Sequence, residues 1–469
     1  MEKIIFYIIA GFLAIMIFRS PNEKKLYWVF ISLLLFPRTI VFSKTPFICF
    51  PVFILSVLYL DFLIHFKKTY KSFKQFPLRV PLLIFFFCLF LVSFFDTKLD
   101  FYLVLYKPFY FLLENFWPAF FAYCCIKTLK GVERTLDVVL SLLFICSVFG
   151  ICNKIMDVNV YTAYISKIFD TIDFGNYYTT VKDTRFRISS FTWNPMYYGI
   201  VVALGILISI FYLTAFKLKR PKMIFCIVTL ILLVINLFLV NSRAPVISLL
   251  AGLGVYYLFG LELNNRLIVM AILCAGFVVF TITFPGKFQL LTSSFRSLSS
   301  GETDVKGSSL SMRVMQLKNS LRVFSTSPIS GKGFDYIEKE LGYTGQFGQN
   351  NHVARHFGGF ESYAFKLLIE QGLMGIIANL VFFSALFDYL FNMKERLNPI
   401  GKKYVFFTVS LLVCFLLFIF SSGDLYSFSF FMLLLGINIG AINLCLKDVE
   451  EEKELPQKNS VFRRYGFQV

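Results

Sequence analysis

The feature that most constrains this chain is a succession of long apolar runs that covers nearly its whole length. Stretches such as 223–240 and 267–284 are about long enough to cross a bilayer as a helix. In lipid, every backbone N–H and C=O group needs a partner within the protein, so such spans are expected to be helical. The sequence therefore predicts an all-α polytopic membrane protein and excludes a soluble globular domain.

The runs predict about 13 transmembrane helices, within a range of about 12–14, because one run is interrupted by prolines. That run covers 101–126 and contains Pro108 and Pro118, so a kinked or broken helix is expected there. The predicted spans lie near 3–18, 26–43, 46–66, 79–95, 101–126, 135–152, 192–215, 223–240, 243–259, 267–284, 362–390, 405–422 and 425–446.

The net charge of +18 is distributed in a way that indicates topology and does not indicate nucleic-acid binding. Basic residues gather in alternate short connections, which the positive-inside rule places in the cytoplasm. The N-terminus is then expected outside and the C-terminal tail inside. The five clusters are Arg19/Lys24/Lys25, Lys67/Lys68/Lys71/Lys74/Arg79, Lys127/Lys130/Arg134, Lys217/Lys219/Arg220/Lys222 and Lys394/Arg396/Lys402/Lys403.

This topology divides the chain into six segments, two of which are long external loops. In chain order they are N-terminal transmembrane helices (1–152), a first external loop (153–190), central transmembrane helices (191–284), a large external loop (285–361), C-terminal transmembrane helices (362–446) and a cytoplasmic tail (447–469).

Several arginines recur at the predicted outer boundary of the membrane. A guanidinium there can extend to lipid headgroups and do nothing more, but its planar fork also suits phosphate oxygens. Arg243 is the hardest to explain by lipid contact, because it interrupts a long hydrophobic hairpin. Together the arginines indicate an outward-facing site for a lipid-linked phosphate or diphosphate, with Arg185, Arg187, Arg243, Arg313 and Arg322 as candidates.

Two of the three histidines in the chain stand close together just before an apolar run, in "NHVARHFGGFESYAFKLLIEQGLMG". His352 and His356 share a face if this stretch is helical, and Glu361 begins the following span. A carboxylate at a helix N-terminus has an ordinary electrostatic explanation, and an HxxxH pair without a third ligand is a weak zinc signal. We expect no metal and no cofactor, and we take these three residues as candidates for the site.

Other ionisable residues have less specific interpretations. His65 lies at the cytoplasmic end of its span and is expected to be structural. Asp61 and Glu114 lie within spans, where each is either a buried pairing residue or part of a polar path. The chain has no Walker motif, so nothing supports ATP hydrolysis.

An ordered set of segments resembles the polysaccharide polymerases and O-antigen ligases of bacterial envelopes. "RFRISSFTWNPMYYGIVVALG" is similar to the family's entry into a span, and "NSRAPVISLLAGLG" to its Ser-Arg element. "SMRVMQLKNSLRVFSTSPISGKGF" resembles its arginine-rich helix ending in "P..G.G", and "ESYAFKLLIEQGLMGII" its closing element. The resemblance covers roughly 185–379. In the ligases the closing element begins with histidine, whereas here that position is Glu361, nine residues before Glu370, which favours the polymerase branch.

The resemblance implies a GT-C-like fold and an inverting, metal-independent glycosyl transfer on the periplasmic face of the bacterial inner membrane. The implied partners are an undecaprenyl-diphosphate-linked glycan donor and acceptor and membrane lipid, with a polysaccharide chain-length regulator as a further candidate. Arg187, Arg243 and Arg313 are then candidates for stabilising the diphosphate leaving group. Glu361 is the first candidate for the base, or for a group that only orients the sugar hydroxyl, and His356 is the second.

Two other functions remain open at this point. An O-antigen ligase would transfer the finished glycan to a lipid A-core acceptor. A lipid-linked oligosaccharide flippase or another transporter is disfavoured, because the charged residues that stand out gather outside the spans and do not line a central cavity.

Overall fold

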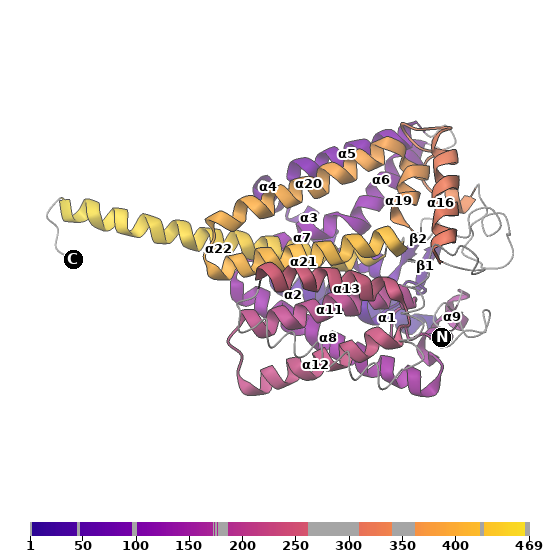
Figure 1. Ribbon diagram of the computed structural model, residues 1–469, viewed down its shortest axis with the longest axis horizontal. Coiled ribbons are helices and arrows are strands. Elements are labelled where there is room, and N and C mark those ends of the chain that lie inside the picture. The colour runs from indigo at the N-terminus through magenta and orange to yellow at the C-terminus, as the bar shows by residue number, and fades with distance from the viewer. Residues whose placement is uncertain are drawn as a thin grey trace, which may run out of the picture.

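A computed structural model describes residues 2–44, 47–95, 101–171, 173, 176, 186–260, 309–339, 362–422 and 426–464. Over these residues the chain is a bundle of helices with a small β-hairpin at one end (Figure 1). The N-terminal part contains α1 (Glu2–Arg19), α2 (Asn22–Leu35), β1 (Val41–Lys44), β2 (Phe47–Cys49), α3 (Phe50–Ile64), α4 (Phe66–Gln75), α5 (Arg79–Phe94), α6 (Phe101–Asn115), α7 (Trp117–Cys125), α8 (Leu129–Met156) and α9 (Val160–Phe169).

The described residues of the central and C-terminal parts are also mainly helical. They contain α11 (Pro195–Ala215), α12 (Arg220–Leu239), α13 (Arg243–Val255), η1 (Tyr256–Gly260), α16 (Ser309–Phe324), α17 (Tyr336–Lys339), α19 (Tyr363–Lys366), η2 (Leu367–Gln371), α20 (Gly372–Arg396), α21 (Pro399–Ser422) and α22 (Ser427–Arg464). The elements η1 and η2 are single turns of π-helix.

Within the described ranges, seven helices are long and apolar enough to cross a membrane, or eight if the bent pair α3 and α4 counts as one span. The molecule is thus an all-α polytopic membrane protein apart from its hairpin. The total of 13 spans remains a prediction, and the span expected over 267–284 lies outside the described residues. The first predicted loop, 153–190, contains the helix α9.

Prolines explain two helix boundaries, one that differs from its prediction and one that confirms it. The span expected over 26–43 is wrong in its extent, since α2 ends at Leu35 and the chain then forms the antiparallel β1–β2 pair. Pro37 explains this end, because proline disfavours a helical conformation in the residue before it. The run 101–126 is broken as its prolines suggested: α6 ends at Asn115, and α7 begins at Trp117 with Pro118 in its first turn.

The bundle is organised around two central helices, α11 and α22, whose apolar segments are mostly buried. Gly436 in α22 allows close contact with α7, since an added Cβ there would lie 2.0 Å from the Ala119 carbonyl oxygen. Small residues permit this kind of close helix packing in membranes. Outer helices instead expose large apolar side chains, including Ile8, Ile231 and Leu380, as expected for a surface covered by lipid.

The two ends of the bundle differ in charge. Hydrogen bonds link Glu23 at the start of α2 to Thr128 before α8, and Lys403 near the start of α21 to Thr214 near the end of α11. Together with the Lys222–Glu133 ion pair and the hydrogen bond from the Tyr123 hydroxyl to the Gln75 carbonyl, these links gather the turns that carry the basic clusters at one end, here called the basic end. The opposite end, where α11, α13 and α22 begin, is called the loop end and lies on the right of Figure 1.

Candidate functional site

The chain enters α11 through a segment, 186–194, that hydrogen bonds fix to its neighbours. Asn194 caps α11, its side-chain oxygen accepting from the Met196 N–H at 2.7 Å. The Ser190 hydroxyl donates to the Cys146 carbonyl of α8 at 2.7 Å. Arg187 lies half-buried in this segment, at the loop end. Arg185 lies outside the described residues.

The turn between α12 and α13 packs directly on the start of α11. The Ser242 hydroxyl lies 3.0 Å from the Met196 sulfur. An added Cβ on Gly199 would lie 2.6 Å from the Pro245 ring, so only glycine leaves room for this turn. Two segments that the sequence singled out separately, "NPMYYG" and "NSRAP", are therefore parts of one loop-end surface.

Arg243 is the first residue of α13 and its side chain is exposed at the loop end. The positive end of the helix macrodipole disfavours a cation at this position. Helix stability therefore gives no reason for an arginine here. Its exposure leaves the guanidinium accessible to a ligand, which is what a phosphate-binding role requires.

The other two candidate arginines within the described residues lie on α16, which packs against η2. Arg313 is half-buried, with its Nη1 3.5 Å from Oε1 of the buried Gln316. Arg322 is exposed in the last turn of α16. A cation in the last turn interacts favourably with the helix dipole, so Arg322 has a structural explanation that Arg243 does not share.

The glycine-rich ends of two sequence motifs interlock in what we call the clasp, formed by residues 327–334 and 369–374. Four backbone hydrogen bonds join its two strips: Lys332 N–H to Ile369 O at 2.8 Å, Gly333 N–H to Glu370 O at 3.0 Å, Leu373 N–H to Pro328 O at 2.9 Å and Met374 N–H to Ile329 O at 3.1 Å. The motifs "SPISGKGF" and "EQGLMG" are thus two halves of one backbone structure.

Glycine is required where the two halves of the clasp meet. Gly331 has φ +70° and Gly372 has φ +59° with ψ −151°, conformations that other residues rarely adopt. A Cβ on Gly372 would lie 2.5 Å from the Gly331 nitrogen, and a Cβ on Gly331 would lie 2.5 Å from the Gln371 nitrogen. The close approach of the two backbones therefore explains both glycines.

Glu370 belongs to the clasp by its hydrogen bonding. Its Oε1 accepts from the Ile337 N–H at 3.2 Å, at the start of α17. Asp335, two residues before Ile337, forms an ion pair with Lys107 of α6. The clasp and the adjoining Asp335 therefore tie this part of the large loop to α20 and α6, and the glutamate of "EQGLMG", Glu370, has a structural role.

A pocket that the sequence did not predict opens at the loop end between α2, α3, α6, α11 and α22. Arg38 and Glu114 form an ion pair in its wall, with side chains that are 14% and 7% exposed. The Arg38 guanidinium also lies 3.7 Å from the centre of the Tyr426 ring. The only sequence signal was Glu114 within an apolar run, and nothing in the sequence indicated its partner.

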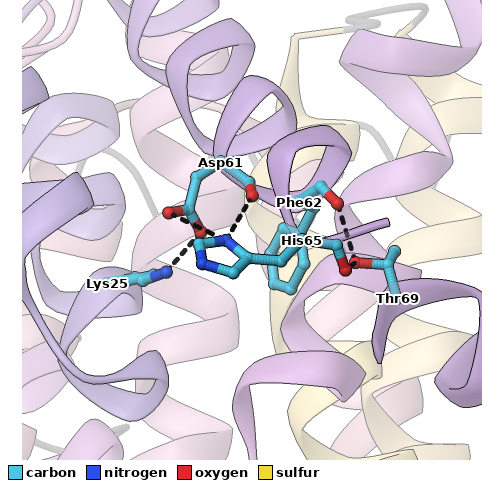
Figure 2. A network of polar contacts seen from close by, with 5 residues as sticks. All are labelled: Lys25, Asp61, Phe62, His65 and Thr69. Atoms are coloured by element: carbon cyan, nitrogen blue, oxygen red, sulfur yellow. Dashed lines mark hydrogen bonds and ion pairs between the residues drawn. The ribbon is translucent and has the colours of Figure 1, made fainter. Parts of the chain in front are cut away.

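Figure 2 shows the polar network around Asp61, which lies at the opposite, basic end. Asp61 pairs with Lys25, and both side chains are almost completely buried. The His65 Nδ1 lies 2.9 Å from the Asp61 carbonyl oxygen, and the Thr69 hydroxyl donates to the Phe62 carbonyl at 2.8 Å. These contacts hold the 98° bend between α3 and α4. Asp61 is thus a pairing residue and His65 is structural.

The three remaining candidates, Glu361, His356 and His352, lie outside the described residues. The described chain resumes at Ser362, whose hydroxyl donates to the Phe420 carbonyl at 2.7 Å, at the loop end of α21. Across the residues that the structure does describe, no group of three or more His, Cys, Asp or Glu side chains could hold a metal ion.

Residues 228–380 match the family model Wzy_C, described as O-antigen ligase. This match is consistent with a protein of the Wzy/O-antigen ligase type. No curated protein matches the chain. The matched region contains Arg243, α16 and both halves of the clasp, so the family likeness falls on the loop-end surface described above. It indicates a glycosyltransferase-like membrane enzyme of polysaccharide biosynthesis with an O-antigen ligase or polymerase type of function.

Proposed function

We propose that this protein polymerises undecaprenyl-diphosphate-linked oligosaccharide repeat units into O-antigen or a related surface polysaccharide. The observation that carries the proposal is the match over 228–380, which includes Arg243, Arg313, His356 and Glu361. The polymerase branch is favoured over the ligase branch because glutamate, and not histidine, stands at position 361.

The proposed reaction is an inverting displacement on the periplasmic face of the inner membrane. The acceptor hydroxyl attacks the anomeric carbon of the donor glycan, the bond from that carbon to the diphosphate breaks, and the lipid diphosphate leaves as an anion. Glu361 takes the hydroxyl proton or orients the hydroxyl, with His356 as the alternative. No metal takes part, because guanidinium groups supply the positive charge.

Arg243 is the best-supported residue for the leaving group, because its position at the start of α13 is exposed and not explained by helix stability. Arg187 lies on the adjoining segment 186–194, and Arg313 is half-buried on α16 at the same end. Guanidinium groups that already face the diphosphate stabilise the charge that develops on it in the transition state.

The test is the glycolipid profile of a deletion strain complemented with variants and resolved by gel. Arg243→Ala is expected to remove the ladder of long chains, with single repeat units left, whereas Arg243→Lys retains part of it. Arg220→Ala is the matched control, since Arg220 is also an exposed first residue of a helix but lies at the basic end. An unchanged ladder in Arg243→Ala would overturn this role.

The same gel tests the base and the second candidate function. Glu361→Gln should abolish the ladder while the protein stays in the membrane. The matched control Glu370→Gln keeps a hydrogen-bond acceptor in the clasp and should retain the ladder. The O-antigen ligase alternative is supported by the description of the matching family. It predicts instead that the deletion strain accumulates long lipid-linked polymer that is not transferred.

A further inference from the structure

The Arg38–Glu114 pocket lies outside the region that matches the family, so that match assigns it no role. The pocket is narrow between its side chains and open to the surface, so a ligand would be held at its mouth. Thr192 and Trp193, in the segment that also carries Arg187, form one wall of the pocket. The pocket is therefore continuous with the loop-end surface on which we place the reaction.

The charges in the pocket are balanced. Arg38 and Glu114 neutralise one another, and the Tyr426 ring covers the guanidinium at 3.7 Å. An arginine that binds a diphosphate must present its positive charge without a carboxylate beside it. The paired charges therefore disfavour a phosphate group here, while a guanidinium and a carboxylate together can donate to and accept from neutral hydroxyl groups.

Aromatic rings supply the other half of the pocket. Trp193 and Tyr426 meet edge to face, with ring centres 5.0 Å apart, and Tyr197 lies beside them in the lining. Aromatic rings offer apolar faces together with polar N–H or O–H edges. A pyranose ring presents the matching chemistry, with C–H groups on its faces and hydroxyl groups around its rim.

Resting on the function proposed above, we propose that the pocket formed by Arg38, Glu114, Trp193 and Tyr426 binds a neutral sugar of the glycan substrate. The diphosphate then lies on the loop-end arginines and the sugar in the pocket. Selection of the repeat unit depends in part on residues far from the matched region in sequence. The ion pair positions the sugar and takes no part in bond breaking.

The test is binding to the purified full-length protein in detergent. Trp193 becomes the single tryptophan in the variant Trp28→Phe/Trp117→Phe, and its fluorescence is followed during titration. One probe is the neutral oligosaccharide released by mild acid from lipid-linked repeat units of the producing cells, and the other is inorganic pyrophosphate. The oligosaccharide should change the Trp193 emission in a saturable way, and pyrophosphate should leave it unchanged.

A second measurement does not depend on the tryptophan substitutions. Isothermal titration of the oligosaccharide into wild type and into Arg38→Met/Glu114→Gln should show binding at least about ten-fold weaker in the variant, the size expected for losing one good contact. The variant must elute and unfold like wild type for the comparison to hold. Asp335→Asn is a control, since Asp335 forms an ion pair at the loop end but lies outside the pocket.

The outcomes separate this inference from the proposed function. The first outcome is that wild type makes the ladder and binds the oligosaccharide, but the Trp193 emission does not change and the double variant binds as tightly as wild type. The pocket inference is then overturned and the polymerase proposal stands. If Trp193 responds to pyrophosphate and not to the oligosaccharide, the pocket is an anion site and the inference is overturned. If the oligosaccharide binds in the pocket while the deletion strain still makes the ladder, the pocket inference stands and the polymerase proposal fails.

Discussion

At the scale of single residues, this protein places ionisable side chains within the bundle in pairs. Lys25 with Asp61 and Arg38 with Glu114 each join two segments that are distant in sequence. Removing one partner of a buried ion pair costs on the order of several kcal/mol, because the other charge is left buried and unpaired. Pairing makes these positions tolerable, but pairing by itself does not say which of them has a function.

The Lys25–Asp61 pair gives a direct test of a purely structural role. Asp61→Asn leaves Lys25 charged and buried, and should lower the free energy of unfolding by about 3–5 kcal/mol. Lys25→Met/Asp61→Leu removes both charges and should recover most of that loss. Thermal unfolding in detergent measures both effects, and a double variant as unstable as the single one would contradict this account.

Glu370 also tests a structural role at a single residue. Glu370→Ala leaves the Ile337 N–H without its side-chain acceptor and should lower the free energy of unfolding by about 1–3 kcal/mol. Glu370→Gln keeps an oxygen acceptor and should remain close to wild type in stability. Thermal unfolding measures the stability of both variants. Normal stability of Glu370→Ala together with loss of the ladder would indicate a catalytic role instead.

At the scale of elements, the clasp joins residues 327–334 of the large loop to η2 and the start of α20. Its four backbone hydrogen bonds bring the end of α16 to the junction of η2 and α20, where a π-helical turn interrupts the regular helix. Single π turns often occur at functional sites. The clasp therefore sets where α16, and with it Arg313, lies relative to α20.

Substitution of a clasp glycine should show whether the activity requires this position of α16 relative to α20. Gly372→Ala demands a backbone conformation that costs about 1–3 kcal/mol for a residue with a Cβ, and that Cβ would also approach the Gly331 nitrogen to 2.5 Å. We expect a lower thermal unfolding temperature and loss of the ladder.

Gly254→Ala is the matched control for the clasp. Gly254 lies within α13, and an added Cβ there meets nothing within 4 Å. Helix propensity then favours alanine by up to about 1 kcal/mol, so this variant should be as stable as wild type or more stable. If Gly372→Ala and Gly254→Ala have the same unfolding temperature and make the same ladder, the clasp backbone accommodates the added Cβ without loss.

At the scale of the whole molecule, charge and packing agree on one orientation. The turns that carry the basic clusters lie at one end of the bundle, and the loop-end arginines lie at the other. The positive-inside rule then places the basic end in the cytoplasm. We therefore propose that the site faces outward, where a lipid-linked repeat unit would meet it.

Cysteine labelling in whole cells tests this orientation. Ser242→Cys at the loop end should react with a membrane-impermeant maleimide from outside, whereas Lys219→Cys at the basic end should react only after the cells are opened. Wild type gives the background from its own cysteines, of which Cys152 is exposed. Labelling of Lys219→Cys in intact cells would reverse the proposed topology.

The sequence by itself determined the features that depend on local composition. Apolar length predicted the seven membrane-length helices found among the described residues, alternating charge predicted the two ends, and Pro108 with Pro118 predicted a break in the fifth span, which occurs at Phe116. The same local reasoning placed Arg243 at a loop-end turn. It succeeded because lipid acts on each segment separately, so the hydropathy of a segment is enough to place it.

Only the tertiary structure decided what depends on contacts between distant segments. It paired Arg38 with Glu114, packed Pro245 against Gly199, and joined "SPISGKGF" to "EQGLMG" through glycines whose purpose the sequence could not show. It also ended α2 at Leu35, where hydropathy had predicted a longer span. Such contacts arise from the way whole helices fit together, and many pairings of apolar helices satisfy the same hydropathy pattern.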